Sequence, residues 1–208
     1  MGDFLSAAAP RAHFTRYLTR SEVACLLGTI RRRRGNIARR DAALIRIALQ
    51  SGFRIGSVAG LTVGDAQEGA RAGRLRARAE HAKRGRAYDV PVSRKLRRAL
   101  KEALAVRRAM GFPLDDTAAP LFVSREGTPL SVRAMQHQFR TWRIAAGLSM
   151  PASFHWLRHT AAKRVLASTE SRDPLGVAQA VLGHANRKST AIYLLPDREE
   201  LADAMEAI

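Results

Sequence analysis

The sequence predicts a mainly α-helical domain with one small antiparallel β-sheet. Apolar residues recur at helical spacing over most of the 208 residues, whereas alternation at every second residue is confined to residues 73–92. Hydrophobic residues make up 46% of the chain, which is enough for a packed core. The length fits one domain with short extensions. No apolar run approaches the roughly 20 residues of a membrane span.

The charge balance indicates a polyanionic partner. Lys and Arg number 36 against 18 Asp and Glu, giving a formal net charge of +18. Such a balance favours nucleic acid over an acidic membrane surface. Charge alone would suit a basic ribosomal or chromatin protein equally well, so it defines only the class of partner. The N-terminus lacks the pattern of a secretory signal, which predicts a cytoplasmic protein with no membrane partner.

The first quarter of the chain predicts two helices. Thr19 or Ser21 can cap the first, which runs to about Ile30. Its Cys25 lies in an apolar helical pattern and is expected to be buried. As the one cysteine in the sequence, it excludes a disulfide within the chain. Residues 36–51 are apolar nearly all round, which predicts a central, buried helix.

Four arginines follow the first helix directly. Such a run is usually a solvated helix end, but in so basic a protein we predict that it contacts DNA phosphates. The four residues are Arg31, Arg32, Arg33 and Arg34.

The alternating segment predicts a basic β-hairpin. Residues 73–79 and 86–92 have strand patterns, and the turn between them places Lys83 near the tip. Residues 71–108 contain 14 Lys or Arg and 3 Asp or Glu, so this half of the domain is expected to face DNA. The hairpin residues predicted to contact DNA are Arg84 and Arg86.

Helical periodicity resumes after the hairpin. The predicted helices cover residues 93–110, 131–146, 155–168, 174–182 and 189–193, and Asp197 caps an acidic final helix. One stripe of the second of these helices is predicted to be core: Val132, Met135, Phe139 and Trp142.

Several residues suit chemistry on a phosphate. His155 and Arg158 are three apart, so they share one face of a helix, and arginine presents a planar fork of donors to phosphate oxygens. Arg54 stands at a helix start, where an anion would be held by both the side chain and the helix N-terminus. Downstream of Arg158, Tyr193 is the candidate nucleophile that is neither a histidine nor a serine or threonine. A tyrosine near Arg and His donors indicates covalent attack on a phosphodiester.

These residues carry a resemblance to a known family. HWLRHTAA…VLGHANRKSTAIY resembles the H-x-L-R-H…L-G-H…Y signature of the tyrosine recombinases, the phage integrase family. The segment GFRIGSVAGL resembles the first arginine box of that family, T-G-L-R-x-S-E-L-x-x-L, and HAKRGRAYDVPV resembles its lysine hairpin. Ser57 departs from the pattern, because the family usually has Glu or Asp there. The resemblance implies the catalytic-domain fold of this family and a catalytic set of Arg54, Lys83, His155, Arg158, His184 and Tyr193.

The resemblance also implies a role for each residue. Tyr193 would attack the DNA and form a 3′-phosphotyrosyl intermediate, while Lys83 would give a proton to the departing 5′ oxygen. His155 and His184 would donate hydrogen bonds or help to move the tyrosine proton.

The charge that develops on the phosphate would be stabilised by arginines. Arg54 and Arg158 would clamp the non-bridging oxygens, whose charge grows in the transition state. No cofactor is expected: these cations take the place of a metal, and the phosphotyrosyl bond stores the energy for resealing without ATP.

The predicted organisation has three parts: a basic N-terminal arm (1–18), a catalytic domain (19–195) and a C-terminal helix (196–208) that could be exchanged between protomers. About 18 residues precede the catalytic domain, as in short family members such as the fimbrial phase-variation invertases. The expected partners are double-stranded DNA with a specific recombination site, copies of the chain in a homotetramer on two sites, and an accessory DNA-binding protein.

The leading prediction is a site-specific DNA recombinase. Two alternatives stay open. A type IB topoisomerase would use the same catalytic set without joining two sites, and a DNA-binding regulator derived from a recombinase would explain Ser57.

Overall fold

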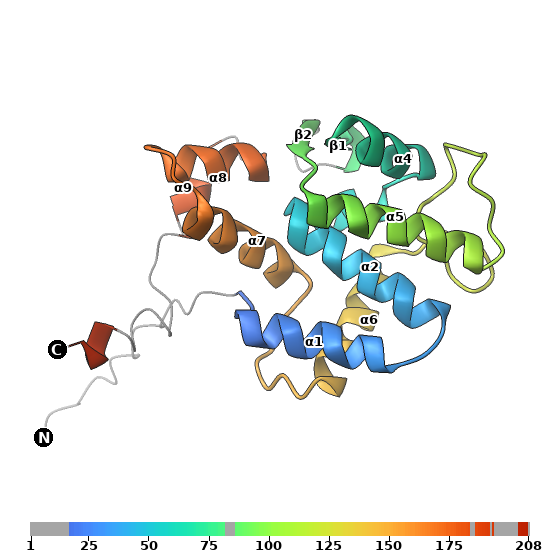
Figure 1. The fold of residues 1–208 in the computed structure, drawn as a ribbon, viewed down its shortest axis with the longest axis horizontal. Coiled ribbons are helices and arrows are strands. Elements are labelled where there is room, and N and C mark those ends of the chain that lie inside the picture. Colours follow the sequence, from blue (N-terminus) through green and yellow to red (C-terminus); the bar gives the residue numbers. More distant parts are fainter. Residues whose placement is uncertain (1–16, 82–85, 184–185, 192, 194–203, 208) are drawn as a thin grey trace, which may run out of the picture.

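The computed structural model describes residues 17–81, 86–183, 186–191, 193 and 204–207 (Figure 1). They form a mainly helical domain with one two-stranded sheet, so the predicted fold class is confirmed. None of the described helices is long and apolar enough to cross a membrane. The elements are α1 (Arg20–Arg32), α2 (Asn36–Ser51), α3 (Ile55–Ala59), α4 (Val63–Ala72), β1 (Arg74–Ala77), the 3-10 turn η1 (Ala79–His81), β2 (Tyr88–Pro91), α5 (Arg94–Ala109), α6 (Val132–Ala145), α7 (His155–Ser168), α8 (Pro174–Leu182) and α9 (Lys188–Ala191).

Helix α2 is the centre of the domain, as predicted. It packs against α1, α3, α5 and α7, and most of its side chains are buried, including Leu44, Ile45 and Ile47. Gly52 ends the helix with φ 65°, a left-handed conformation that glycine adopts without steric cost. The chain then turns, and Arg54 becomes the N-cap residue of α3, two residues after Gly52.

A buried ion pair lies within the apolar pattern of α2. Arg40 donates through Nε and Nη2 to Oδ1 of Asp41, at 3.0 and 2.8 Å. Its remaining bonds reach the Val123 carbonyl and the Gln138 side chain, both at 2.7 Å. Trp142 donates to the other oxygen of Asp41 at 2.8 Å. Burial raises the pKa of Asp41, and Arg40 opposes that shift. The network therefore joins α2 to α6 and to the segment before it.

The predicted hairpin is present as two short antiparallel strands. Leu75 of β1 pairs with Val90 of β2, and both are buried against the core. The other side of β1 is exposed and carries Arg74 and Arg76. Lys83 at the predicted tip lies outside the described residues, as does Arg84.

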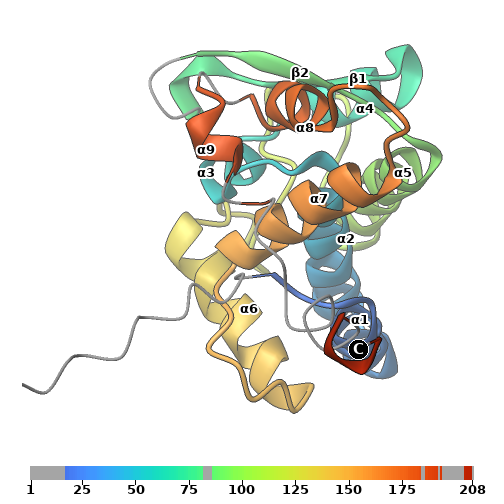
Figure 2. The same ribbon diagram turned by 90° about the vertical axis from the view of Figure 1, so that its left-hand side faces the viewer.

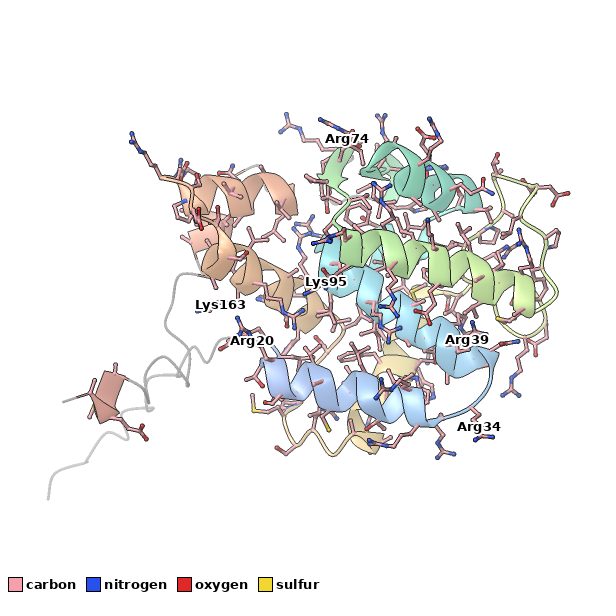
Figure 3. All side chains as sticks on the ribbon, viewed as in Figure 1. Arg20, Arg34, Arg39, Arg74, Lys95 and Lys163 are labelled. Atoms are coloured by element: carbon pink, nitrogen blue, oxygen red, sulfur yellow. The ribbon has the colours of Figure 1, made fainter. Side chains whose placement is uncertain are left out.

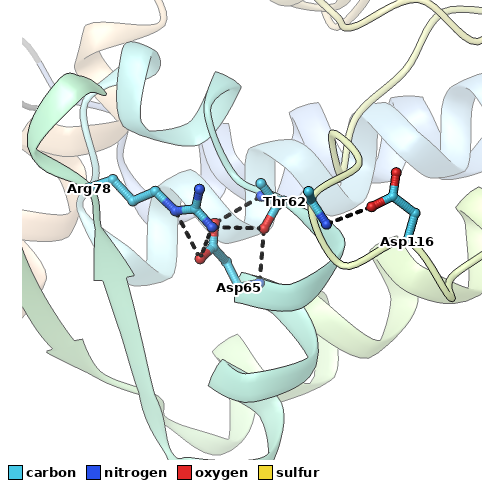
Figure 4. A network of polar contacts seen from close by, with 5 residues as sticks. Thr62, Asp65, Arg78 and Asp116 are labelled. Carbon is cyan, nitrogen blue, oxygen red and sulfur yellow. Dashed lines mark hydrogen bonds and ion pairs between the residues drawn. The ribbon is translucent and has the colours of Figure 1, made fainter.

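Helix α4 was not predicted, although the sequence contains its caps. Thr62 and Asp65 form a capping box at its start, and Gly73 ends it with φ 76°. Arg78 donates to Asp65 Oδ1 at 3.0 Å and to Thr62 Oγ1 at 3.2 Å (Figure 4). The helix N-terminus is thereby tied to the end of β1.

Two buried positions were predicted wrongly. Val132 is 37% exposed because it is the first residue of α6. The buried residues of this helix, Met135 and Phe139, lie further along it. Cys25 is exposed because the buried face of α1 is formed by Val23, Leu26 and Ile30. Its Sγ donates a hydrogen bond to the carbonyl of Ala146 at 3.3 Å.

The Arg40–Asp41 pair gives a stability prediction. We expect Asp41→Ala to lower the free energy of unfolding by about 3–5 kcal/mol, because it leaves a guanidinium buried without its counter-ion. The control is Glu68→Ala, which removes the partner of Arg71 in a pair whose side chains are 57% and 77% exposed, and should cost about 0.5 kcal/mol or less. Denaturant unfolding measures both. Equal losses in the two variants would contradict the assignment.

Candidate active site

Arg158 is the buried centre of the candidate site. It lies in the first turn of α7, is 1% exposed, and is the largest fully buried side chain of the described residues. Its Nη1 donates to the Gly52 carbonyl at 2.6 Å, and its Nη2 donates to the Leu182 carbonyl at 2.7 Å. The hydroxyl of Tyr88 accepts a third, longer bond from Nη1 at 3.3 Å. These acceptors come from the ends of α2 and α8 and from β2.

Arg54 is close to Arg158, as the sequence predicted. It occupies the N-cap position of α3, without a capping hydrogen bond from its side chain, and is half-buried. Burial lowers the pKa of Arg54, the charge of Arg158 lowers it further, and Tyr88 and Tyr193 oppose both. Neither arginine forms an ion pair with a carboxylate among the described residues. Two adjacent cations without a carboxylate make a favourable place for an anion.

Tyr193 faces the same two arginines. It is 4% exposed and packs with Ala162 and Leu182. Burial raises the pKa of Tyr193, whereas Arg158, Arg54 and a hydrogen bond with Arg158 lower it. The cations therefore offset part of the cost of forming a phenolate in a buried position.

The histidines of α7 complete a row of rings beside Tyr193. His159 meets the Tyr193 ring edge to face, with the centroids 5.0 Å apart. Its other neighbour is His155, at 4.6 Å. His155 is exposed, so it reaches solvent at the side of the row away from Tyr193. The structure thus brings together Arg54, His155, Arg158 and Tyr193, whereas His184 and Lys83 lie outside the described residues.

Ser57 contacts the connection between β1 and β2 through His81, the last residue of η1. Ser57 is buried, and its hydroxyl donates to the His81 carbonyl at 3.1 Å. The ring of His81 lies directly against Gly60, where a Cβ atom would overlap it. Helix α3 is therefore in contact with the last described residue before Lys83.

The four predicted DNA-binding arginines of the α1–α2 turn are all exposed. Arg31 and Arg33 line a groove of about 570 Å³ between α1, α2 and α5. Arg39 and Lys95 line the same groove, and Arg34 lies at the turn between α1 and α2 (Figure 3). Figure 2 shows α3 and α9 on one side of α2 and α5 on the other. The groove is thus lined by different elements from those that carry Arg54 and Tyr193. On the hairpin, Arg86 is exposed, and Arg84 is not described.

Two contributors to the site were missed by sequence reasoning. Tyr88 alternates with Val90 and Val92 in the predicted strand of residues 86–92, and that pattern was the available signal for its inward direction. Phe53 was unassigned, yet its ring is 1% exposed and contacts Tyr88 edge to face at 5.6 Å.

The contact between Gly60 and His81 can be tested. We expect Gly60→Ala to displace the His81 ring and to speed hydrogen exchange at the His81 amide, which donates to the Arg78 carbonyl. The backbone of Gly60, with φ −82°, accepts alanine, so the free energy of unfolding should change by less than about 1 kcal/mol. Gly28→Ala is the control, because its Cβ would meet nothing nearer than Arg32 at 3.9 Å. Unchanged exchange at His81 would show that this contact does not hold the turn.

Comparison with known proteins finds a family match over most of the chain. The model of the Phage integrase family matches residues 16–200. Tyrosine recombinase XerC of Azotobacter vinelandii is 37% identical over 166 residues, which cover 80% of this chain and 51% of that protein. The XerC of Haemophilus influenzae is 32% identical over 167 residues, covering 80% and 52%. The chain therefore spans about half the length of the curated relatives it matches.

Solved structures share the fold. The XerA recombinase has a TM-score of 0.75 at 22% identity, covering 95% of this chain and 65% of that one. A complex of the XerH site-specific recombinase bound to its difH substrate has a TM-score of 0.66 at 22% identity, covering 91% and 53%. With a family match across most of its length, the chain belongs to the phage integrase family, the tyrosine recombinases.

Proposed function

We propose that this domain cleaves and rejoins DNA strands through a 3′-phosphotyrosyl intermediate, as the catalytic domain of a site-specific recombinase. The observation that carries the proposal is the placement of buried Tyr193 against Arg158 and Arg54, which have no carboxylate partner among the described residues. A phosphodiester supplies the negative charge that this pair of arginines lacks. It also supplies a phosphorus atom for the phenol to attack.

The geometry supports a division of labour. Arg54 and Arg158 stabilise the charge that grows on the non-bridging oxygens during attack. The same two cations favour the phenolate form of Tyr193, which burial alone would disfavour. His155 is at the exposed end of the ring row and donates to the phosphate or moves a proton. For Lys83 and His184, which lie outside the described residues, the proposed roles rest on the sequence motifs alone: Lys83 protonates the departing 5′ oxygen, and His184 provides a further donor.

The proposed partner is double-stranded DNA with a specific recombination site. The net charge of +18 favours this partner. Solved structures with a similar fold include the Tn1549 transposon integrase in complex with transposon right end DNA. We further propose a homotetramer on two DNA sites in the cytoplasm, with an accessory DNA-binding protein contributing to site recognition. The exposed arginines of the α1–α2 turn and Arg86 contribute phosphate contacts.

Tyr193→Phe tests the reaction. We expect this variant to bind DNA normally but to form no covalent adduct with a nicked suicide substrate, because the ring still packs while the nucleophile is gone. Tyr17→Phe is the matched control, since Tyr17 packs beside Lys163 at the start of the domain, and it should form the adduct at the wild-type rate.

Each alternative has its own outcome in this assay. An adduct with the Tyr193→Phe variant would assign the attack to another residue. Failure of the wild-type protein to form an adduct on its own site would favour the DNA-binding regulator. Relaxation of supercoiled plasmid that lacks a recombination site would favour a type IB topoisomerase.

We also propose that the C-terminal segment docks on a neighbouring protomer. Residues 197–208 contain five acidic residues and one cation, with Leu201, Met205 and Ile208 at helical spacing. Met205 is 70% exposed. The groove between α1, α2 and α5 has a matching character, because its cationic rim surrounds an apolar floor. Besides Arg31 and Arg33, which are proposed to contact DNA, the rim includes Arg39, Lys95, Arg98 and the ion-paired Arg46 and Glu102, and the floor includes Leu27, Ile30, Ala38, Ala42 and Ala99.

Two variants test this docking. We expect truncation after Pro196 to leave single-site binding intact and to remove the complex that pairs two sites, and we expect Arg98→Glu in the groove to remove that paired complex as well. Arg125→Glu has the same change in net charge at an exposed position outside the groove and should keep the paired complex. Gel-shift titrations with one and two sites measure both steps. A truncated protein that still pairs two sites would show that the segment packs on its own domain.

A further inference from the structure

Tyr88 is the side chain that brings the hairpin into the candidate active site. It is the first residue of β2, where it pairs with Ala77 of β1. Its hydroxyl lies 3.3 Å from Nη1 of Arg158. The same nitrogen donates to the Gly52 carbonyl at 2.6 Å. Nη1 therefore has one backbone acceptor and one side-chain acceptor here, and Tyr193 also forms a hydrogen bond with the Arg158 side chain.

The ring of Tyr88 is held on two sides. Phe53, which precedes Arg54, meets it edge to face with the centroids 5.6 Å apart. On another side is Gly183, where a Cβ atom would lie only 2.5 Å from Cγ of Tyr88. A side chain at residue 183 would push the ring away. Packing thus fixes the direction of the hydroxyl before any substrate is present.

These contacts connect four segments of the candidate site. Tyr88 lies on the hairpin that carries Lys83, touches the residue before Arg54, bonds to Arg158 and packs on the residue before His184. Burial lowers the pKa of Arg54, and nearby Tyr88 opposes that shift. The backbone acceptors of Arg158 belong to the ends of α2 and α8. Tyr88 is therefore a direct contact between strand β2 and the Arg158 guanidinium.

We propose that Tyr88 is a positioning residue: its hydroxyl orients the Arg158 guanidinium and couples the lysine hairpin to it. This inference rests on the proposed function for its effect on catalysis. Tyr88 acts through Arg158 rather than on the DNA, because its described hydrogen bond is to Arg158. A hydrogen bond to a charged group, once lost, changes an equilibrium or a rate by roughly 10-fold or more. Its removal should be visible in cleavage and not in the binding of DNA.

The conservative variant is Tyr88→Phe, which keeps the ring between Phe53 and Gly183 and removes only the hydroxyl. We expect it to bind single sites as the wild-type protein does and to cleave about 10-fold more slowly. In an Arg158→Lys background, where there is no guanidinium to orient, the same substitution should change the residual cleavage rate by less than about twofold. Tyr17→Phe serves as control in both backgrounds.

This cycle has two outcomes that overturn the proposal. A Tyr88→Phe variant that cleaves at the wild-type rate would show that the hydroxyl does not position Arg158. An equal loss in the Arg158→Lys background would show that Tyr88 acts independently, for example by donating to the phosphate itself.

A spectroscopic measurement separates this inference from the proposed function. In 15N NMR of the full chain, we expect the Arg158 Nη signals to be resolved by slow rotation, and Tyr88→Phe to shift the Nη1 signal and speed its rotation. An unchanged Arg158 signal would overturn the inference whatever the activity. A changed signal in a protein that forms no covalent adduct with DNA would keep the positioning contact and reject the proposed function.

Discussion

The burial of the Arg158 guanidinium is the constraint on which the rest of the site depends. Withdrawing such a group from water is costly unless its N–H groups find acceptors. Its two shortest described hydrogen bonds are accepted by the carbonyls of Gly52 and Leu182, at the C-terminal ends of α2 and α8. Helix C-termini have unpaired carbonyls and partial negative charge. Two helix ends therefore converge on one cation, and both helices are ended by left-handed glycines, with φ 65° at Gly52 and 60° at Gly183.

Holding Arg158 by backbone carbonyls leaves the site with uncompensated positive charge. Backbone carbonyls satisfy hydrogen bonds without contributing a formal negative charge, so Arg54 and Arg158 still repel one another. An ion pair with a carboxylate would relieve that repulsion and at the same time compete with an incoming phosphate. The carbonyls hold Arg158 in place and leave the charge available. Buried Arg40 differs from Arg158 in this respect, because it forms an ion pair with the carboxylate of Asp41.

The sequence was informative where a local pattern determines the structure. The bounds of α2, α7 and α8 were predicted because apolar spacing, Gly52 and Pro174 act locally, and the order of motifs placed Arg54, Arg158 and Tyr193 in one site. The features that the sequence did not predict depend on contacts between segments that are distant in the chain. Nothing in the sequence near Arg40 shows that it will be buried beside Asp41, and the alternation that turned Tyr88 inward does not reveal that its hydroxyl meets a helix seventy residues later. Helix α4 was missed because its apolar residues are few and small.

The exposure of Cys25 has a practical consequence for following assembly. The sequence of 208 residues contains one thiol, and it lies on the solvent side of α1 rather than in the core. Its Sγ hydrogen bond to a carbonyl on the neighbouring loop fixes its position without enclosing it. A maleimide dye can therefore be attached at one defined point without engineering the chain. Energy transfer between donor- and acceptor-labelled copies would then report the distance between protomers on DNA in real time.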